Sequence, residues 1–182
     1  MGQSALIVID MLNRYEHEDA EPLRASVRTV APVLGELVRR AREAEALVVY
    51  VNDNHGDWTA GRSAISRDAL DGAAPELVEP IVPGPDVPFL VKARHSAFYA
   101  TQLEHLLREQ EVDRLVLAGQ VTEQCVLYTA LDAYVRGFAV TVPRDAVAHI
   151  HQDLADAALR MMEVNMRADV VDAADALIPL SR

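Results

Sequence analysis

The sequence predicts an α/β fold in which helices cover both faces of a doubly wound parallel sheet. Three observations lead to this three-layer class. Short runs rich in β-branched residues alternate with longer segments of helical periodicity. The short runs are apolar throughout, which is typical of strands buried on both faces of a parallel sheet. No internal repeat or low-complexity segment interrupts the alternation.

The alternation defines the elements in chain order. Strands are expected at residues 5–10, 46–52, 88–93, 114–119, 138–143 and 168–173. Helices are expected at residues 21–45, 101–111, 122–136 and 152–167. Pro22 suits the first turn of the first helix, and Asp153 places a negative charge early in the last one. Residues 53–87 are rich in Gly, Pro and Asp and long for a connection, so we expect a partly helical segment that serves function.

Length and composition limit the class of protein. The 182 residues fit one domain, residues 1–182, with a sizeable core. The net charge of −11 disfavours nucleic acid and anionic membranes as partners, because their phosphates would be repelled. One cysteine cannot form an internal disulfide, and the start of the chain lacks the basic segment of an export signal. We therefore expect a cytoplasmic protein.

Three polar residues stand at or near strand ends, where open α/β sheets bind ligands. Asp10 ends the first strand, Lys92 lies near the end of the third, and the fourth runs into the loop before Cys125. Each alone has an ordinary structural role, as a turn-capping Asp, a solvated Lys or a buried Cys. Together they are complementary, because a thiol nucleophile needs a base and a nearby ammonium lowers the pKa of both acids.

The residues around Cys125 favour a reactive thiol. Thr122 is a candidate N-cap, which would place Cys125 at the third position of a helix whose apolar residues recur at helical spacing over 126–134. A sulfur there lies near the positive end of the helix dipole, which favours the thiolate. Free N–H groups in the first turn can also stabilise an oxyanion.

Three longer segments carry a family resemblance over nearly the whole chain. They are "ALIVIDMLNRYEHEDAEPL" (5–23), "VKARHSAFYATQLEHLL" (91–107) and "LVLAGQVTEQCVLYTALDAYVRGFAVTVPRDAVA" (115–148). They resemble the isochorismatase-like cysteine hydrolase family, specifically its thiol branch, which is related to nicotinamidase and N-carbamoylsarcosine amidohydrolase. The resemblance implies a six-stranded sheet in the order 3-2-1-4-5-6. That order puts the second strand between those of Lys92 and Asp10, so Lys92 must reach inward.

The resemblance also implies the chemistry. Asp10, Lys92 and Cys125 would form a triad, and a cis peptide bond between Gln120 and Val121 would bring the N–H groups of Val121 and Cys125 together as an oxyanion hole. The thiol branch hydrolyses C–N bonds in small amides, ureido and carbamoyl compounds through a thioester, and its members usually form homo-oligomers. Asp10 would take the thiol proton and return it to the leaving amine, while Lys92 orients Asp10.

Aromatic residues near the strand ends are candidates for the substrate pocket. They are Tyr15, Trp58, Phe98, Tyr99 and Tyr128, with Gln120 beside the expected cis bond. Flat side chains of this kind stack on planar substrates, although ordinary core or interface positions explain them as well.

Two alternatives stay open. Asp53 and His55 resemble the Asp-x-His pair that binds a metal in the nicotinamidase branch, and a metal there would make the chain a metal-assisted amidase. No second His follows in this segment, and two ligands make a poor metal site. We therefore expect no cofactor. The absence of phosphate-binding glycine patterns also argues against nucleotide cofactors. A non-catalytic or receiver-like binding module would also place an Asp after the first strand, but the paired acids of receivers are missing.

Overall fold

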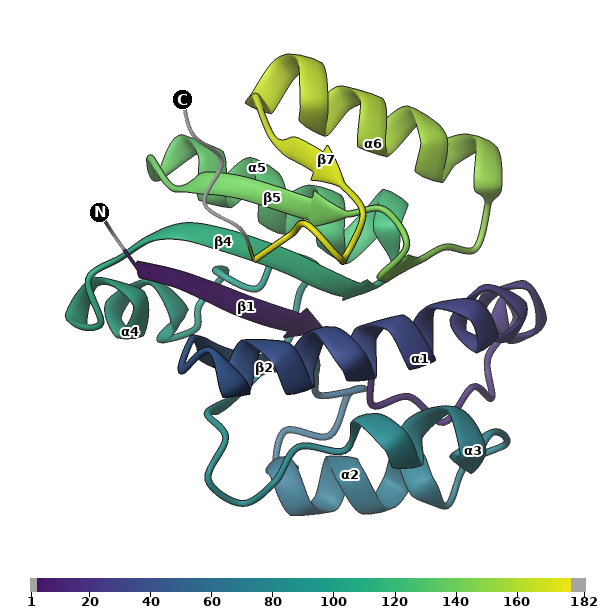
Figure 1. Cartoon of the computed structure of the whole chain (residues 1–182). Coiled ribbons are helices and arrows are strands. Elements are labelled where there is room, and N and C mark those ends of the chain that lie inside the picture. Colours follow the sequence, from purple (N-terminus) through teal and green to yellow (C-terminus); the bar gives the residue numbers. More distant parts are fainter. Residues whose placement is uncertain (1–2, 178–182) are drawn as a thin grey trace.

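A parallel sheet runs through the middle of the molecule in the computed structural model, which describes residues 3–177 (Figure 1). Its strands are β1 (Gln3–Ile9), β2 (Leu47–Asp53), β3 (Phe89–Lys92), β4 (Val112–Gln120), β5 (Ala139–Pro143), β6 (Val147–Ala148) and β7 (Asp169–Val171). The order is β3-β2-β1-β4-β5-β7, and every pairing is parallel. The predicted fold class and strand order are therefore confirmed.

One strand was not expected. β6 is two residues long and pairs with the end of β4, with Gly119 opposite Val147 and Gln120 opposite Ala148. A segment this short leaves no periodicity in the sequence, so the six expected strands correspond to β1–β5 and β7. β6 matters because it extends the sheet beside the carboxyl end of β4, where the chain turns towards Cys125.

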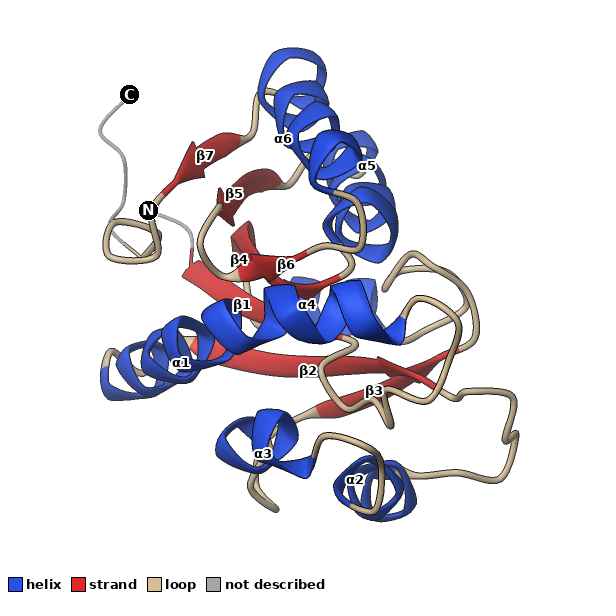
Figure 2. Ribbon diagram, turned by 90° about the vertical axis from the view of Figure 1, so that its right-hand side faces the viewer, coloured by secondary structure: helices blue, strands red, loops and turns tan. Residues whose placement is uncertain are grey.

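The helices form two layers. They are α1 (Ala20–Glu43), α2 (Arg62–Leu70), α3 (Pro75–Val78), α4 (Leu103–Glu109), α5 (Leu127–Val135) and α6 (Gln152–Met166). Figure 2 shows α5 and α6 side by side along the part of the sheet formed by β5 and β7. No helix within residues 3–177 has both the length and the apolar character that crossing a membrane requires.

β1 shows how the sequence builds both layers. Leu6 and Val8 pack into a core with apolar residues of α1, α2 and α3, while Ala5, Ile7 and Ile9 pack into a second core with residues of α4, α5 and α6. All five side chains are buried. An apolar residue at every position is thus what a strand covered on both faces needs, because successive side chains point to opposite faces.

The segment 53–87 is partly helical, as expected. It contains α2, α3 and a 3₁₀ turn (Glu79–Ile81) that follows α3 directly. Ile65 of α2 and Leu77 of α3 are buried in the same core as α1, so these helices extend that layer. The stretch before α2 carries no regular structure and runs next to the carboxyl end of β2. This stretch, residues 54–60, forms part of the site described next.

Candidate active site

Asp10 lies one residue beyond β1, at the carboxyl edge of the sheet. Its N–H still donates to the Val51 carbonyl at 3.0 Å, so the ladder between β1 and β2 fixes its backbone. Its Oδ1 accepts a hydrogen bond from the Asp53 N–H at 2.7 Å, and its carbonyl accepts one from Gln120 Nε2 at 2.6 Å. Both neighbouring strands therefore hold buried Asp10: β2 bonds to its carboxylate and its N–H, and β4 bonds to its backbone carbonyl.

Gly119 allows β4 to approach β1 closely at this edge. Its φ is +119°, and a Cβ at this position would lie 2.2 Å from the Ile9 carbonyl oxygen. No side chain fits there, and the backbone conformation itself favours glycine. The approach places Gln120, the next residue, beside the backbone of Asp10.

Lys92, the last residue of β3, brings a cation to the Asp10 carboxylate. Its Nζ lies 2.8 Å from Asp10 Oδ2 and 3.5 Å from Asp53 Oδ2, and it donates to Cys125 Sγ at 3.6 Å. The side chain is 1% exposed, and Lys92 is the only lysine in the sequence. It pairs with Asp53 in the ladder, so its side chain passes the end of β2 to reach Asp10. The inward reach expected from the strand order is thus present.

Cys125 lies in a π-helical turn (Thr122–Val126) that leads into α5, and this corrects the expected regular helix over 122–136. The capping residue is Val121, whose carbonyl accepts hydrogen bonds from the N–H groups of Gln124 and Val126. Thr122 is not the N-cap, because its hydroxyl donates instead to the Ala148 carbonyl of β6 at 2.9 Å. Cys125 is half-buried, with its sulfur beside Lys92.

The electrostatics differ from the expected thiolate. Burial, followed by the negative charge of Asp10, raises the pKa of the Cys125 thiol, and the Lys92 ammonium offsets only part of this rise. Burial likewise raises the pKa of Asp10, against the opposing effects of Lys92 and of a hydrogen bond from Cys125. Burial alone would lower the pKa of Lys92, but neighbouring acids, Asp10 foremost, outweigh it and the pKa is raised. These shifts favour the protonated thiol, beside Lys92 and Asp10 at an ion-pair distance of 2.8 Å.

The peptide bond between Gln120 and Val121 is cis, as predicted. The Val121 N–H has no hydrogen-bond acceptor among residues 3–177. Cys125 lies four residues further along, within the turn that Val121 caps. An unpaired N–H at the start of the turn that carries the sulfur is a donor open to a ligand.

Asp53 and His55 do not form a metal site with other residues. His55 Nε2 lies 3.1 Å from the Leu12 carbonyl oxygen, so it donates a proton there, and the His55 N–H bonds to Asp53 Oδ1 at 2.8 Å. The second oxygen of Asp53 faces Lys92. Within the described part of the chain, no group of three or more His, Cys, Asp or Glu side chains is placed to hold a metal ion.

A cavity of about 420 Å³ opens beside Lys92. Its wall combines the 54–60 stretch with the segment after β3, and its lining residues include Asn54, Asp57, Trp58, Lys92, Arg94 and Tyr99. Trp58 is 82% exposed at this site, and Tyr128 lines an adjoining cavity of about 350 Å³ that shares Arg94 and Tyr99. A ligand next to Lys92 would therefore meet Trp58, whereas Tyr128 belongs to the adjoining cavity.

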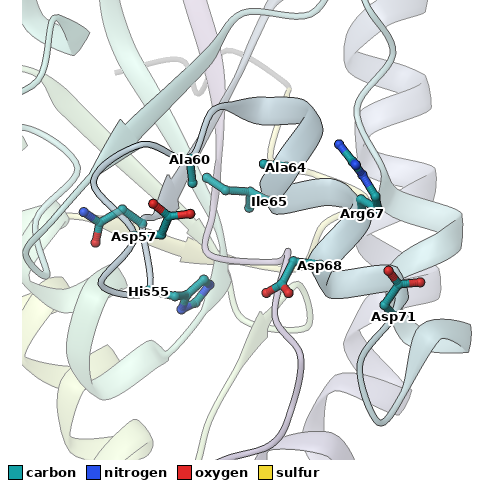
Figure 3. Close-up of a pocket in the computed structure, with 9 residues that line it drawn as sticks. His55, Asp57, Ala60, Ala64, Ile65, Arg67, Asp68 and Asp71 are labelled. Atoms are coloured by element: carbon teal, nitrogen blue, oxygen red, sulfur yellow. The ribbon is translucent and has the colours of Figure 1, made fainter.

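A second cavity, of about 370 Å³, lies between the 54–60 stretch and α2 (Figure 3). It shares Asn54, Asp57 and Ala60 with the cavity beside Lys92. Its other lining residues are His55, Ala64, Ile65, Arg67, Asp68 and Asp71. None of Asp10, Lys92 and Cys125 lines it, whereas Lys92 lines the larger cavity, which is therefore the better candidate for substrate.

Three of the expected pocket residues lie in the interior instead. Tyr15 is 2% exposed, and its hydroxyl donates to Gln120 Oε1 at 3.3 Å. Gln120 itself is buried between this hydroxyl and the Asp10 carbonyl. Phe98 is 5% exposed and stacks on Phe138 with ring centroids 5.9 Å apart. All three side chains are buried against other protein groups, so they are not accessible to a ligand in this structure.

Sequence reasoning missed two residues. Asn52, buried near the end of β2, accepts from the Leu12 N–H at 2.9 Å and donates to the Leu12 carbonyl at 3.1 Å, which holds the chain just after Asp10. Its signal was a polar residue closing an apolar strand, the same pattern that identified Asp10. Arg94 lines the cavity two residues after Lys92, and an exposed charge at that point resembles any solvated strand end.

Comparisons with known proteins show the family and the fold of the chain. The family model of the isochorismatase domain matches residues 4–175. The isochorismatase family protein YaaI of Bacillus subtilis is 34% identical over 93% of each chain, and the maleamate amidohydrolase of Pseudomonas putida is 31% identical over 95% of this chain and 84% of its own. The crystal structure of the nicotinamidase PncA from Bacillus subtilis superposes with a TM-score of 0.74 at 30% identity, covering 93% of this chain and all of that one.

Proposed function

This chain belongs to the isochorismatase family and is a hydrolase of carbon–nitrogen bonds, and from this premise we propose that Cys125 is its nucleophile. The substrate is a small amide, ureido or carbamoyl compound that is cleaved through a thioester. One observation supports this most directly: Lys92 Nζ lies within hydrogen-bonding distance of both the Asp10 carboxylate and the Cys125 sulfur. A base (Asp10), a cation (Lys92) and a thiol (Cys125) from three separate segments are thus close enough to act on the same substrate carbonyl.

In the first step, the Cys125 sulfur attacks the substrate carbonyl while its proton passes to Asp10. The raised pKa of the thiol keeps the sulfur protonated until a substrate arrives, and the raised pKa of Asp10 makes its carboxylate a stronger base. Lys92 keeps that carboxylate ionised and oriented. The proton then moves from Asp10 to the leaving nitrogen as the carbon–nitrogen bond breaks, which leaves a thioester.

The second step uses the same groups. Asp10 takes a proton from water as the water oxygen attacks the thioester carbonyl, and it returns this proton to the Cys125 sulfur as the carbon–sulfur bond breaks and the acid leaves. In both steps the carbonyl oxygen gains negative charge, and we assign its stabilisation to the N–H groups of Val121 and Cys125. The unpaired Val121 N–H supports this assignment. Trp58 and Tyr128 are proposed to contact the substrate from the cavity wall.

The test is to trap the intermediate. Wild-type protein incubated with a mixture of small amides is expected to acquire an acyl mass on Cys125, detected by mass spectrometry of the peptide. Cys125→Ser and Cys125→Ala should lose ammonia or amine release while their circular dichroism and unfolding curves stay close to wild type. Turnover by Cys125→Ala at the wild-type rate would rule out the mechanism, and a binding module would release no ammonia at all.

The metal-assisted alternative depends on Asp53 and His55. Their polar atoms already contact Lys92, the His55 backbone and the Leu12 carbonyl. Hydrolysis should therefore persist after treatment with a chelator, and His55→Gln should retain metal-independent activity. Loss of activity that returns on adding zinc would favour the metal-assisted reaction.

We further propose that residues 1–182 act as one domain in the cytoplasm and assemble into a homo-oligomer. The support for assembly is a set of large apolar side chains left exposed on α5 and α6, namely Leu131, Val135, Leu154, Met161 and Val164. Light scattering of the purified chain should give a multiple of the 20.0 kDa protomer mass. A monomer at micromolar concentration would contradict assembly without affecting the chemistry.

A further inference from the structure

Arg94 lies on a short segment that connects two parts of the candidate site. It follows Lys92 by two residues. Further along, the Ala97 N–H donates to Thr129 Oγ1 at 3.0 Å, and the His95 ring lies 5.3 Å from that of Tyr128. Thr129 and Tyr128 belong to α5, the helix that the Cys125 turn leads into. The segment therefore runs from the lysine of the site to α5, the helix that directly follows the Cys125 turn.

Arg94 lines both cavities on this side of the molecule. It borders the cavity of about 420 Å³ together with Lys92 and Trp58, and the adjoining cavity of about 350 Å³ together with Tyr128. Tyr99 also borders both. A ligand in the cavity beside Lys92 therefore lies against Arg94, whose side chain also borders the adjoining cavity.

The charge of Arg94 is uncompensated within the protein. The side chain is exposed and has no ion pair or hydrogen bond within residues 3–177. Lys92, the other cation of the cavity, is already paired with Asp10 at 2.8 Å. Asp57, an acid of the same cavity, directs its carboxylate to the N–H and hydroxyl of Thr59 at 2.8 and 2.7 Å. Arg94 is thus available for an anionic group of the ligand.

We propose that Arg94 forms a carboxylate-binding subsite, so that the substrate is an amide, ureido or carbamoyl compound that also carries a carboxylate. This inference rests on the proposed function and specifies its substrate class. A guanidinium binds a carboxylate through two parallel hydrogen bonds, which fixes orientation as well as position. The chain carries a net charge of −11, which repels anionic substrates, so a local cation at the entrance would also draw them in.

The test compares two alkylating agents on Cys125. Iodoacetate and iodoacetamide carry the same leaving group, but only iodoacetate has a carboxylate, and neither requires turnover. The measured quantity is the ratio of their second-order rate constants at Cys125. Arg94→Gln should lower the iodoacetate-to-iodoacetamide ratio by roughly fivefold or more because the attracting charge is gone, with the iodoacetamide rate nearly unchanged. Arg94→Lys should retain part of the preference.

Arg67→Gln is the matched control. Arg67 is also an exposed arginine, but it lines the cavity of about 370 Å³ next to α2, which Arg94 does not border. Arg67→Gln therefore changes the net charge equally and leaves the proposed subsite intact. Its ratio should match wild type. An unchanged ratio in Arg94→Gln, or an equal fall in both variants, would overturn the subsite. Failure of the proposed function has a different signature: iodoacetamide would still label Cys125, but no amide would be hydrolysed.

Discussion

Lys92 Nζ lies 2.8 Å from Asp10 Oδ2 although a whole strand, β2, separates their strands in the sheet. The contact is possible because β2 ends at Asp53, directly opposite Lys92, so the lysine side chain passes beyond the last residue of β2. Asp53 then contributes its own N–H to the Asp10 carboxylate. The pair is buried, so its charges depend on each other more than surface charges do.

Lys92→Met should destabilise the protein strongly at neutral pH. Removing the ammonium leaves the Asp10 carboxylate buried without its cation, and breaking a buried pair costs roughly 3–5 kcal/mol. Asp10→Asn combined with Lys92→Met should recover much of the loss in urea unfolding. Lys92 lowers the pKa of Asp10, so that pKa rises further in Lys92→Met, and the deficit of this variant should shrink as the pH falls through the higher pKa and the buried acid becomes neutral. Equal unfolding free energies for the single and double variants would contradict the coupling.

The acid limb of the pH–rate profile should lie above the pKa of an exposed aspartate. Asp10 must be ionised to accept the thiol proton, and its pKa is raised by burial, so kcat/KM should fall as the pH drops through the raised value. The pKa of Lys92 is also raised, so its ammonium persists through mildly alkaline pH. Asp10→Asn should be inactive at every pH and should slow alkylation of Cys125. A limb at the ordinary aspartate pKa would argue for a different base.

Gly119→Ala should prevent correct assembly of the site. The new Cβ would lie 2.2 Å from the Ile9 carbonyl oxygen, at a backbone φ of +119°. We expect a loss of several kcal/mol in unfolding free energy, or an unfolded chain, since overpacking and positive-φ strain add. Gly35→Ala is the matched control, because it lies within α1, where a new Cβ would meet nothing within 4 Å, and it should stabilise the protein by up to about 1 kcal/mol. Similar stabilities for the two variants would refute the steric argument.

Asn52→Leu should weaken both stability and activity. The change leaves the Leu12 N–H without its side-chain partner, at a cost of roughly 1–3 kcal/mol, whereas the Leu12 carbonyl keeps its contact with His55 Nε2 at 3.1 Å. Because Leu12 lies two residues after Asp10, kcat/KM should also fall. Asn165→Leu, at an exposed position of α6, should change neither quantity appreciably. A fall in stability with unchanged kcat/KM would show that the hydrogen bonds between Asn52 and Leu12 do not position Asp10 for catalysis.

The strands of this protein could be predicted because burial on both faces leaves a direct trace in the sequence. Runs such as "ALIVI" in β1 allow no solvent-facing residue, and each ends close to where the structure ends it. The positions of Asp10 and Lys92 follow, since parallel strands end at one edge. The strand order and the cis bond came from family resemblance, not from the periodicity of this chain.

The parts that failed depend on contacts between distant segments. Thr122 is a residue type that commonly caps helices, but its hydroxyl donates to the Ala148 carbonyl of β6, a contact that the local sequence does not predict. Tyr15 follows a strand end as a pocket residue would, yet its hydroxyl points to Gln120 in the interior. The thiol of Cys125 lies beside an ammonium and at the start of a helix, but the burial that raises its pKa exists only in the folded chain.

The lone amine-bearing side chain and the lone thiol of this sequence lie 3.6 Å apart. A dialdehyde such as o-phthalaldehyde condenses with one amine and one thiol to give a fluorescent isoindole, which requires both groups within its short span. We therefore expect folded protein to form the isoindole between Lys92 and Cys125, and unfolding to separate the two groups so that the ring no longer closes. Fluorescence of the isoindole would then report the folded fraction of the protein without an introduced label.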